Sequence, residues 1–108
     1  MDRQTRRLYE LKAEIVQAAA HPIRLAIIDF LGAGEQCVCD ISAHVGAKRS
    51  NVSRHLSVML KAGVLDCRKD GLKVIYSLKT PCILKFLDCV TDVLRDQVRQ
   101  SQSVLSRL

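Results

Sequence analysis

The hydrophobic period of the chain changes at residue 64, and this change limits the fold more than any other feature. Before it, apolar residues recur at the spacing of amphipathic helices, and glycines end three of the four helical patterns. After it, two β-prone runs flank Asp70-Gly71, a dipeptide that favours tight hairpin turns. The predicted helices before the change are residues 6–20, 21–34, 39–46 and 50–63, and the predicted hairpin is residues 64–78.

A last helix is predicted over residues 80–98, where apolar residues again form one stripe. Thr80 is the expected N-cap and Pro81 the expected first helical residue. The polar tail, residues 99–108, is expected to fray. The chain of 108 residues therefore has room for one small, mainly α domain with a β-hairpin.

A short helix, a tight turn, a longer helix and a hairpin are the layout of a winged helix-turn-helix, which places the second helix in the major groove. We expect residues 38–63 to form the helix-turn-helix and residues 64–78 the wing, within a single domain of residues 1–108. Basic and polar side chains stand where this layout meets DNA. The predicted DNA-binding residues are Lys48, Arg49, Ser50, Asn51, Ser53, Arg54, His55, Arg68, Lys69 and Lys73.

The charge balance agrees with a nucleic-acid partner. Seventeen Lys and Arg face eleven Asp and Glu, a formal net charge of +6, which favours polyanions. Aromatic residues make up only 4% of the chain, which argues against a stacking platform for single strands. Double-stranded operator DNA is the expected partner, and solvated polar faces are the alternative explanation for the same residues.

The cysteines and the first residues of the chain indicate the compartment. No signal-peptide pattern opens the sequence, and no apolar run approaches the roughly 18 residues of a membrane span. We therefore expect a cytoplasmic protein with no membrane partner. In a reducing compartment, cysteines close in sequence favour metal binding or redox chemistry over a disulfide framework.

Four motifs carry a resemblance to a known family. "HPIRLAIIDFL", "CVCDI", "SNVSRHLSVMLKAGVL" and "RKDGLKVIYSL" follow one another as in the ArsR/SmtB family of metal-sensing bacterial repressors, and the resemblance covers residues 8–95. It implies a homodimer joined through the first and last helices, which binds its operator when ligand-free and releases it when an inducer arrives. It also implies a regulator and not an enzyme. The apolar stripes of these two helices independently favour a dimer, because the small core cannot cover them.

The pair Cys37-Val38-Cys39 lies where the arsenical and cadmium/lead sensors of that family hold their inducer. Thiolates are soft ligands, and a helix N-terminus stabilises them. The resemblance implies trivalent arsenic as inducer, with antimony, cadmium or lead next. The family's third cysteine is replaced here by Ser42. Core packing is the alternative role for the pair.

The other cysteines leave alternatives open. Cys82 and Cys89 lie seven residues apart on one face of the predicted last helix, as possible third ligands or as interface packing. Cys67 is interpreted as a structural thiol. A zinc site of the family on the last helix is rejected because no histidine lies there, and His44 is expected to be a capping or surface residue. The alternative function is a repressor of the same fold that responds to thiol oxidation or to sulfide and persulfide.

Overall fold

The structure is a computed structural model that describes residues 1–108. It confirms the predicted order of helices and hairpin and adds one short strand before the third helix. In chain order the elements are α1 (Arg3–Ala19), α2 (Pro22–Gly32), β1 (Gln36–Cys37), α3 (Val38–Val45), α4 (Arg49–Lys61), β2 (Leu65–Asp70), β3 (Lys73–Leu78) and α5 (Ile83–Ser106). The mainly α fold with a small antiparallel sheet is therefore as predicted.

One core lies between α2, α3, α4 and the base of the sheet. Each helix contributes apolar residues at three- and four-residue spacing, so that one face of each is buried. Burial of these apolar side chains is the main source of stability for a domain of this size. Its fully buried large side chains are Ile27, Ile28, Ile41, Val52, Leu56, Met59, Val64 and Leu65.

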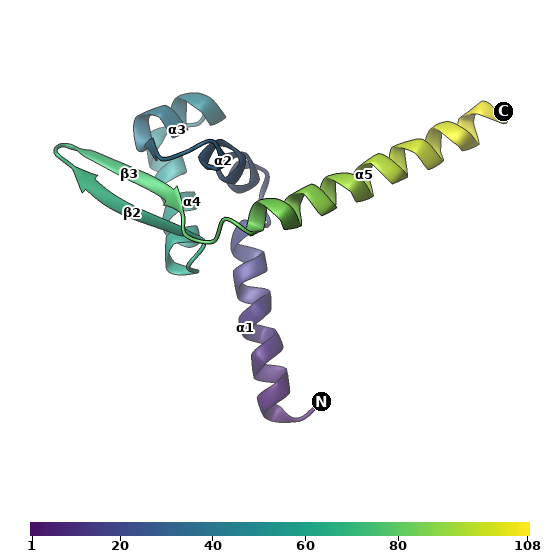
Figure 1. Cartoon of the computed structure of the whole chain (residues 1–108), viewed down its shortest axis with the longest axis horizontal. Helices are drawn as coiled ribbons and strands as arrows, with labels where there is room; N and C mark the ends of the chain where they lie inside the picture. The colour runs from purple at the N-terminus through teal and green to yellow at the C-terminus, as the bar shows by residue number, and fades with distance from the viewer.

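The three-stranded sheet has the order β1-β3-β2, with both pairs antiparallel. β2 and β3 form a hairpin that projects from the helical body (Figure 1). Asp70 still pairs with Lys73, so the two-residue turn is Gly71-Leu72, one residue later than predicted. Gly71 has φ +62°, which a glycine adopts without steric cost. The strand β1 was not predicted, because two residues carry no periodicity.

The start of α5 differs from the prediction. Thr80 and Pro81 precede the helix, and the N-cap is Cys82. The Thr80 hydroxyl donates instead to the carbonyl oxygen of Gly63, 3.2 Å away. The side chain predicted to begin α5 thus connects the segment before α5 to the turn that follows α4.

The end of α5 also differs, because the predicted frayed tail is helical as far as Ser106. Val98 and Leu105 continue the apolar stripe for about three turns beyond Leu94, so the helix remains amphipathic to its end. The polar composition of residues 99–108 concealed this stripe.

Helices α1 and α5 extend away from the core in different directions (Figure 1). No residue of α5 is buried, and α1 buries only Ala18 and Ala19. The radius of gyration is 17.3 Å, against about 13 Å for a compact domain of roughly 100 residues. One chain alone therefore leaves two apolar helix faces uncovered.

No single helix is long and apolar enough to cross a membrane, and only α1 and α2 together, bent by 82°, meet that test by length and composition.

Candidate nucleic-acid interface and thiol site

The turn between α3 and α4 fixes the direction of the second helix. α3 ends at Gly46, whose φ of +68° allows the Gly46 and Ala47 amides to donate to the carbonyl oxygen of Ser42. Lys48 is the N-cap of α4. Because Val52, Leu56 and Met59 turn one face of α4 into the core, its opposite face is presented to solvent.

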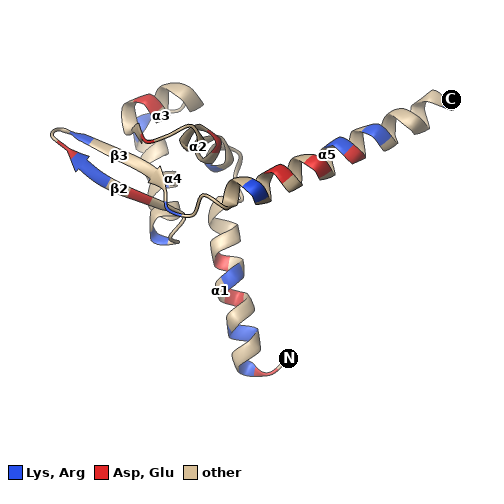
Figure 2. Cartoon of the chain, in the orientation of Figure 1, with Lys and Arg blue, Asp and Glu red and all other residues tan.

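Most of the predicted DNA-binding residues are exposed on α4, in the turn before it or on the hairpin. Eight of the ten are exposed, whereas Asn51 and His55 are half-buried. Figure 2 shows Lys and Arg on the hairpin strands and near the turn. The exposed residues are Lys48, Arg49, Ser50, Ser53, Arg54, Arg68, Lys69 and Lys73. Their contact with DNA stays a prediction.

His55 is turned toward α2. Its Nδ1 accepts a hydrogen bond of 3.1 Å from the Nε of Arg24, and its ring centroid lies 4.4 Å from that of His21. Burial lowers the pKa of His55, and electrostatic repulsion from His21, Arg24 and Arg54 lowers it further. His55 is therefore held as a neutral imidazole.

The wing is tied to the segment that precedes the cysteine pair. The Nε of Arg68 on β2 donates to Glu35 at 3.0 Å, and a longer contact of 4.0 Å joins Arg68 to Asp70. Glu35 immediately precedes β1. An exposed ion pair of this kind contributes little to stability, but it links Arg68 to the loop before Cys37.

The two cysteines of the motif lie in different environments. Cys37 ends β1, pairs with Ile75 of β3, serves as N-cap of α3, and is buried with 8% of its surface exposed. Cys39 is exposed in the first turn of α3, beside Asp40. The positive end of the α3 dipole favours anions at this place, including thiolates. The Cys37 thiol is thus packed inside the fold, and the Cys39 thiol faces solvent.

The sheet register separates Cys67 from Cys37. In the register of the sheet, Cys37 of β1 and Arg68 of β2 both lie opposite Ile75 of β3. Cys67 lies opposite Tyr76, one position farther along β3 and thus in the adjacent row of paired residues. Adjacent rows of a sheet face opposite sides, so Cys67 does not face the same side as Cys37. Burial and then the neighbouring Cys67 raise the pKa of Tyr76.

The last helix supplies no third thiol within the same chain. Cys82 lines an apolar cavity of about 220 Å³ between α1 and α5, and Cys89 is exposed farther along α5. All five cysteines are free thiols. No three His, Cys, Asp or Glu side chains gather into a metal site. The start of α3 thus carries two thiols, and no third His, Cys, Asp or Glu side chain joins them in a metal site.

Ser42 occupies the place of the family's third cysteine. It is buried at 9% exposure, and its hydroxyl oxygen has no hydrogen-bond partner. His44, two residues later, is exposed and stacks on Phe30 with centroids 4.0 Å apart, which agrees with the predicted surface role. Sequence reasoning missed Arg24 and Glu35, whose partners lie 31 and 33 residues away along the chain.

Comparisons with known proteins agree with this architecture. Residues 21–66 match the family described as "Bacterial regulatory protein, arsR family". The uncharacterized HTH-type transcriptional regulator Rv0081 of Mycobacterium tuberculosis is 37% identical over 102 residues, covering 94% of this chain and 90% of its own. Its crystal structure superposes with a TM-score of 0.76 at 36% identity, over 86% of this chain and 94% of that one.

Two further relatives have more specific names. The arsenical resistance operon repressor of Staphylococcus xylosus is 30% identical over 82 residues, covering 76% of this chain and 75% of its own. The crystal structure of NolR from Sinorhizobium fredii has a TM-score of 0.79 at 27% identity, over 86% of this chain and 93% of that one. The similarity thus spans the helix-turn-helix, the hairpin and parts of the outer helices.

Proposed function

The chain belongs to the ArsR family of bacterial transcriptional regulators, and we propose that it binds operator DNA as a homodimer and releases it when a thiophilic inducer binds Cys37 and Cys39. The observation that carries the proposal is the position of Cys37. This residue is at once paired with wing strand β3 and the N-cap of α3, the helix packed against α4. A change at the thiol pair therefore acts on both elements expected to touch DNA.

The outer helices support a dimer. Exposed apolar residues run along α1 and α5, among them Leu8, Ile15, Phe86, Leu94 and Val98. Contiguous apolar faces of this kind mark interaction surfaces. A twofold dimer covers them and presents two copies of α4 to half-sites one or more helical turns apart.

The free face of α4 and the hairpin support duplex binding. Ser53 and Arg54 lie in the N-terminal half of α4, which enters the major groove in this fold. Arg68 and Lys73 lie on the hairpin and suit the neighbouring phosphates. Specificity thus resides in α4 and much of the affinity in the wing.

Coupling between inducer and DNA follows the same connections. DNA and inducer need only favour different arrangements of α3, α4 and the hairpin. A coupling free energy of about 1–3 kcal/mol changes operator affinity roughly 5- to 150-fold. The pairing of β1 with β3 and the Glu35–Arg68 ion pair are the contacts that transmit the change to the wing.

The donor set favours a soft ion. Two thiols from Cys37 and Cys39 suit trivalent arsenic first, then antimony, cadmium and lead. The third sulfur of a three-thiolate shell comes from Cys82 or Cys89 of the second subunit, or from a small thiol such as glutathione. X-ray absorption of the arsenic-loaded protein and of Cys82→Ser and Cys89→Ser distinguishes these sources, because the variant that lacks the ligand loses one sulfur.

Matched substitutions test the DNA assignment. Arg54→Ala should abolish the preference for operator over random duplex, whereas Lys73→Ala should weaken binding to both and reduce the salt slope by about one. Electrophoretic mobility shifts or fluorescence anisotropy at several salt concentrations measure both effects. Equal losses on operator and random DNA from the two variants would contradict the placement of α4 in the groove.

Titration of the reduced dimer tests the inducer. Arsenite and cadmium should release the wild type from its operator and leave the Cys37→Ser/Cys39→Ser double variant bound. If the metals have no effect and oxidant or persulfide releases the wild type, with a new sulfur–sulfur link seen by mass spectrometry, the protein is instead a thiol-redox regulator.

A further inference from the structure

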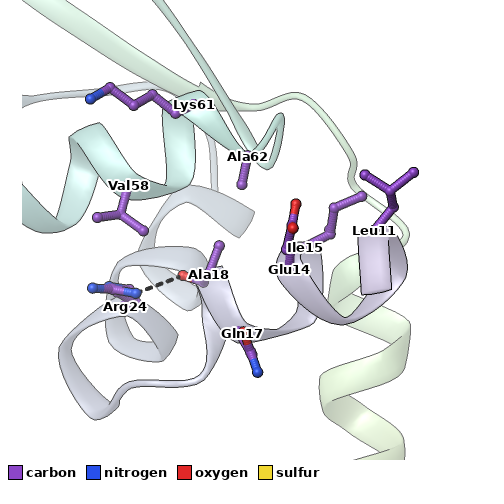
Figure 3. Close-up of a pocket in the computed structure, with 9 residues that line it drawn as sticks. All are labelled: Leu11, Glu14, Ile15, Gln17, Ala18, Arg24, Val58, Lys61 and Ala62. Carbon is purple, nitrogen blue, oxygen red and sulfur yellow. Dashed lines mark hydrogen bonds between the residues drawn. The ribbon is translucent and has the colours of Figure 1, made fainter. Parts of the chain in front are cut away.

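A polar cluster at the corner of α1, α2 and α4 has no part in the proposed function so far. The Nε of Arg24 donates to the Nδ1 of His55 at 3.1 Å, and its Nη1 donates to the carbonyl oxygen of Ala18 at 3.4 Å. Figure 3 shows the second bond and places Arg24 beside Val58 of α4. One guanidinium thus joins the last turn of α1 and the middle of α4.

The Nδ1 atom of each imidazole in the cluster accepts a hydrogen bond. The Nδ1 of His21 accepts from the Ile23 amide at 3.1 Å, and the Nδ1 of His55 accepts from Arg24. An Nδ1 that accepts from Arg24 carries no proton, so the His55 ring is protonated on Nε2 and is neutral. A protonated His55 would point an N–H at the Arg24 N–H, and the bond would be lost.

The cluster lies directly behind the DNA-facing residues of α4. His55 follows Ser53 and Arg54, the residues assigned to the groove, and its ring is turned away from them toward α2. The hydrogen bond from Arg24 to His55 connects the middle of α4 to α2. The same guanidinium holds the end of α1, whose apolar face is the proposed dimer surface.

We propose that Arg24 is a positioning residue for operator binding, which holds α4 in its DNA-reading orientation through the neutral His55 ring and connects it to the dimer helix α1. The role rests on the proposed operator binding. It assigns His55 to the support of α4 instead of to contact with DNA.

The two roles of His55 differ in the sign of their pH dependence. The groups that act on the His55 ring are His21 and Arg24 from α2 and Arg54 on α4 itself, all of which disfavour its protonation. From α1, the contact of the cluster is the uncharged Ala18 carbonyl, and Glu14 faces the groove that Arg24 and Lys61 also line (Figure 3). Acidification should weaken operator binding if His55 supports α4, whereas a His55 that touches phosphate would bind more tightly when charged.

Four variants test the role at neutral pH, with fluorescence anisotropy on operator duplex as the readout. Arg24→Gln should weaken binding about tenfold, because it removes a partly buried, charge-assisted hydrogen bond. Its salt slope should stay that of the wild type, since Arg24 touches no phosphate, whereas Lys73→Ala should lower the slope by about one. His55→Asn places an acceptor near the Nδ1 position and should retain more affinity than His55→Leu.

The pH profile and an NMR titration complete the test. Wild-type affinity should fall between pH 7.5 and 5.5, and that of His55→Asn should stay level. In the DNA-free protein, the pKa of His55 should rise in Arg24→Gln. Wild-type affinity for Arg24→Gln, or an affinity of the wild type that rises with acid, overturns the role of Arg24. A wild type that binds no operator overturns the proposed function itself, and with it this role.

Discussion

The substitution Cys37→Ser separates the structural role of this residue from its role as a ligand. Cys37 is the N-cap of α3 with φ −81° and ψ 160°, the extended conformation of an N-cap, but its side chain accepts no capping hydrogen bond. Serine is among the strongest N-caps, since its hydroxyl accepts from the amide two or three residues later. The candidate donors here are the Cys39 and Asp40 amides.

Two opposing contributions determine how Cys37→Ser changes the free energy of unfolding. The new capping bond contributes about 1 kcal/mol to the free energy of unfolding, and it satisfies a hydroxyl whose burial without a partner costs about 1–3 kcal/mol. Replacing sulfur by oxygen loses apolar burial of a similar size to the capping gain. We therefore expect Cys37→Ser to match the wild type within about 0.5 kcal/mol and Cys37→Ala, which has no cap, to be about 1 kcal/mol less stable than Cys37→Ser.

Urea unfolding at one fixed protein concentration measures this difference, together with operator release by arsenite. The expected combination is a Cys37→Ser protein of wild-type stability that binds the operator and ignores the inducer. Cys39→Ser, at an exposed site, should ignore the inducer with unchanged stability. If Cys37→Ser unfolds as readily as Cys37→Ala, the cap geometry is wrong, and if it still responds to arsenite, the ligand lies elsewhere.

Three further changes have defined outcomes. Ser42→Ala should raise the free energy of unfolding by about 1 kcal/mol in a urea titration, because it removes a buried hydroxyl that has no partner. Gly46→Ala should lower it by about 1–2 kcal/mol, because the φ of +68° is strained for alanine, and thermal unfolding measures the loss. In the folded protein the pKa of His55 is lowered from its ordinary value of 6.5. Below pH 6.5 the unfolded chain therefore binds more protons than the folded one. The stability due to neutral His55 is therefore complete above about pH 6.5 and lost as pH falls below it, and urea midpoints from pH 7.5 to 5.5 should decline less in His55→Asn.

The sequence predicted those parts of the fold that repeat a local signal. Helical spacing, terminal glycines and Asp70-Gly71 were enough to place four helices and the hairpin. The predicted start of α5 was wrong because the Thr80 hydroxyl donates to the carbonyl oxygen of Gly63, a partner 17 residues away that no local pattern reveals. The predicted end of α5 was wrong because the polar composition of residues 99–108 conceals apolar residues that still recur at helical spacing.

The candidate site was predictable by residue type but not by arrangement. Spacing identified Cys37 and Cys39 as a pair, but the burial of one and the exposure of the other depend on the two-residue strand β1. The contacts of Arg24 with His55 and of Glu35 with Arg68 join distant segments, so only the folded chain brings them together.

In the proposed dimer, the uncovered faces of α1 and α5 make the stability of this protein a function of its concentration. Association of two chains enters the unfolding equilibrium by mass action, so that dilution lowers the midpoint of unfolding although no contact changes. At low copy number, the fraction of assembled protein and the occupancy of a two-half-site operator then decline together. Newly made chains that have not yet met a second copy carry the most accessible apolar surface, and they are the species that proteases and chaperones meet first.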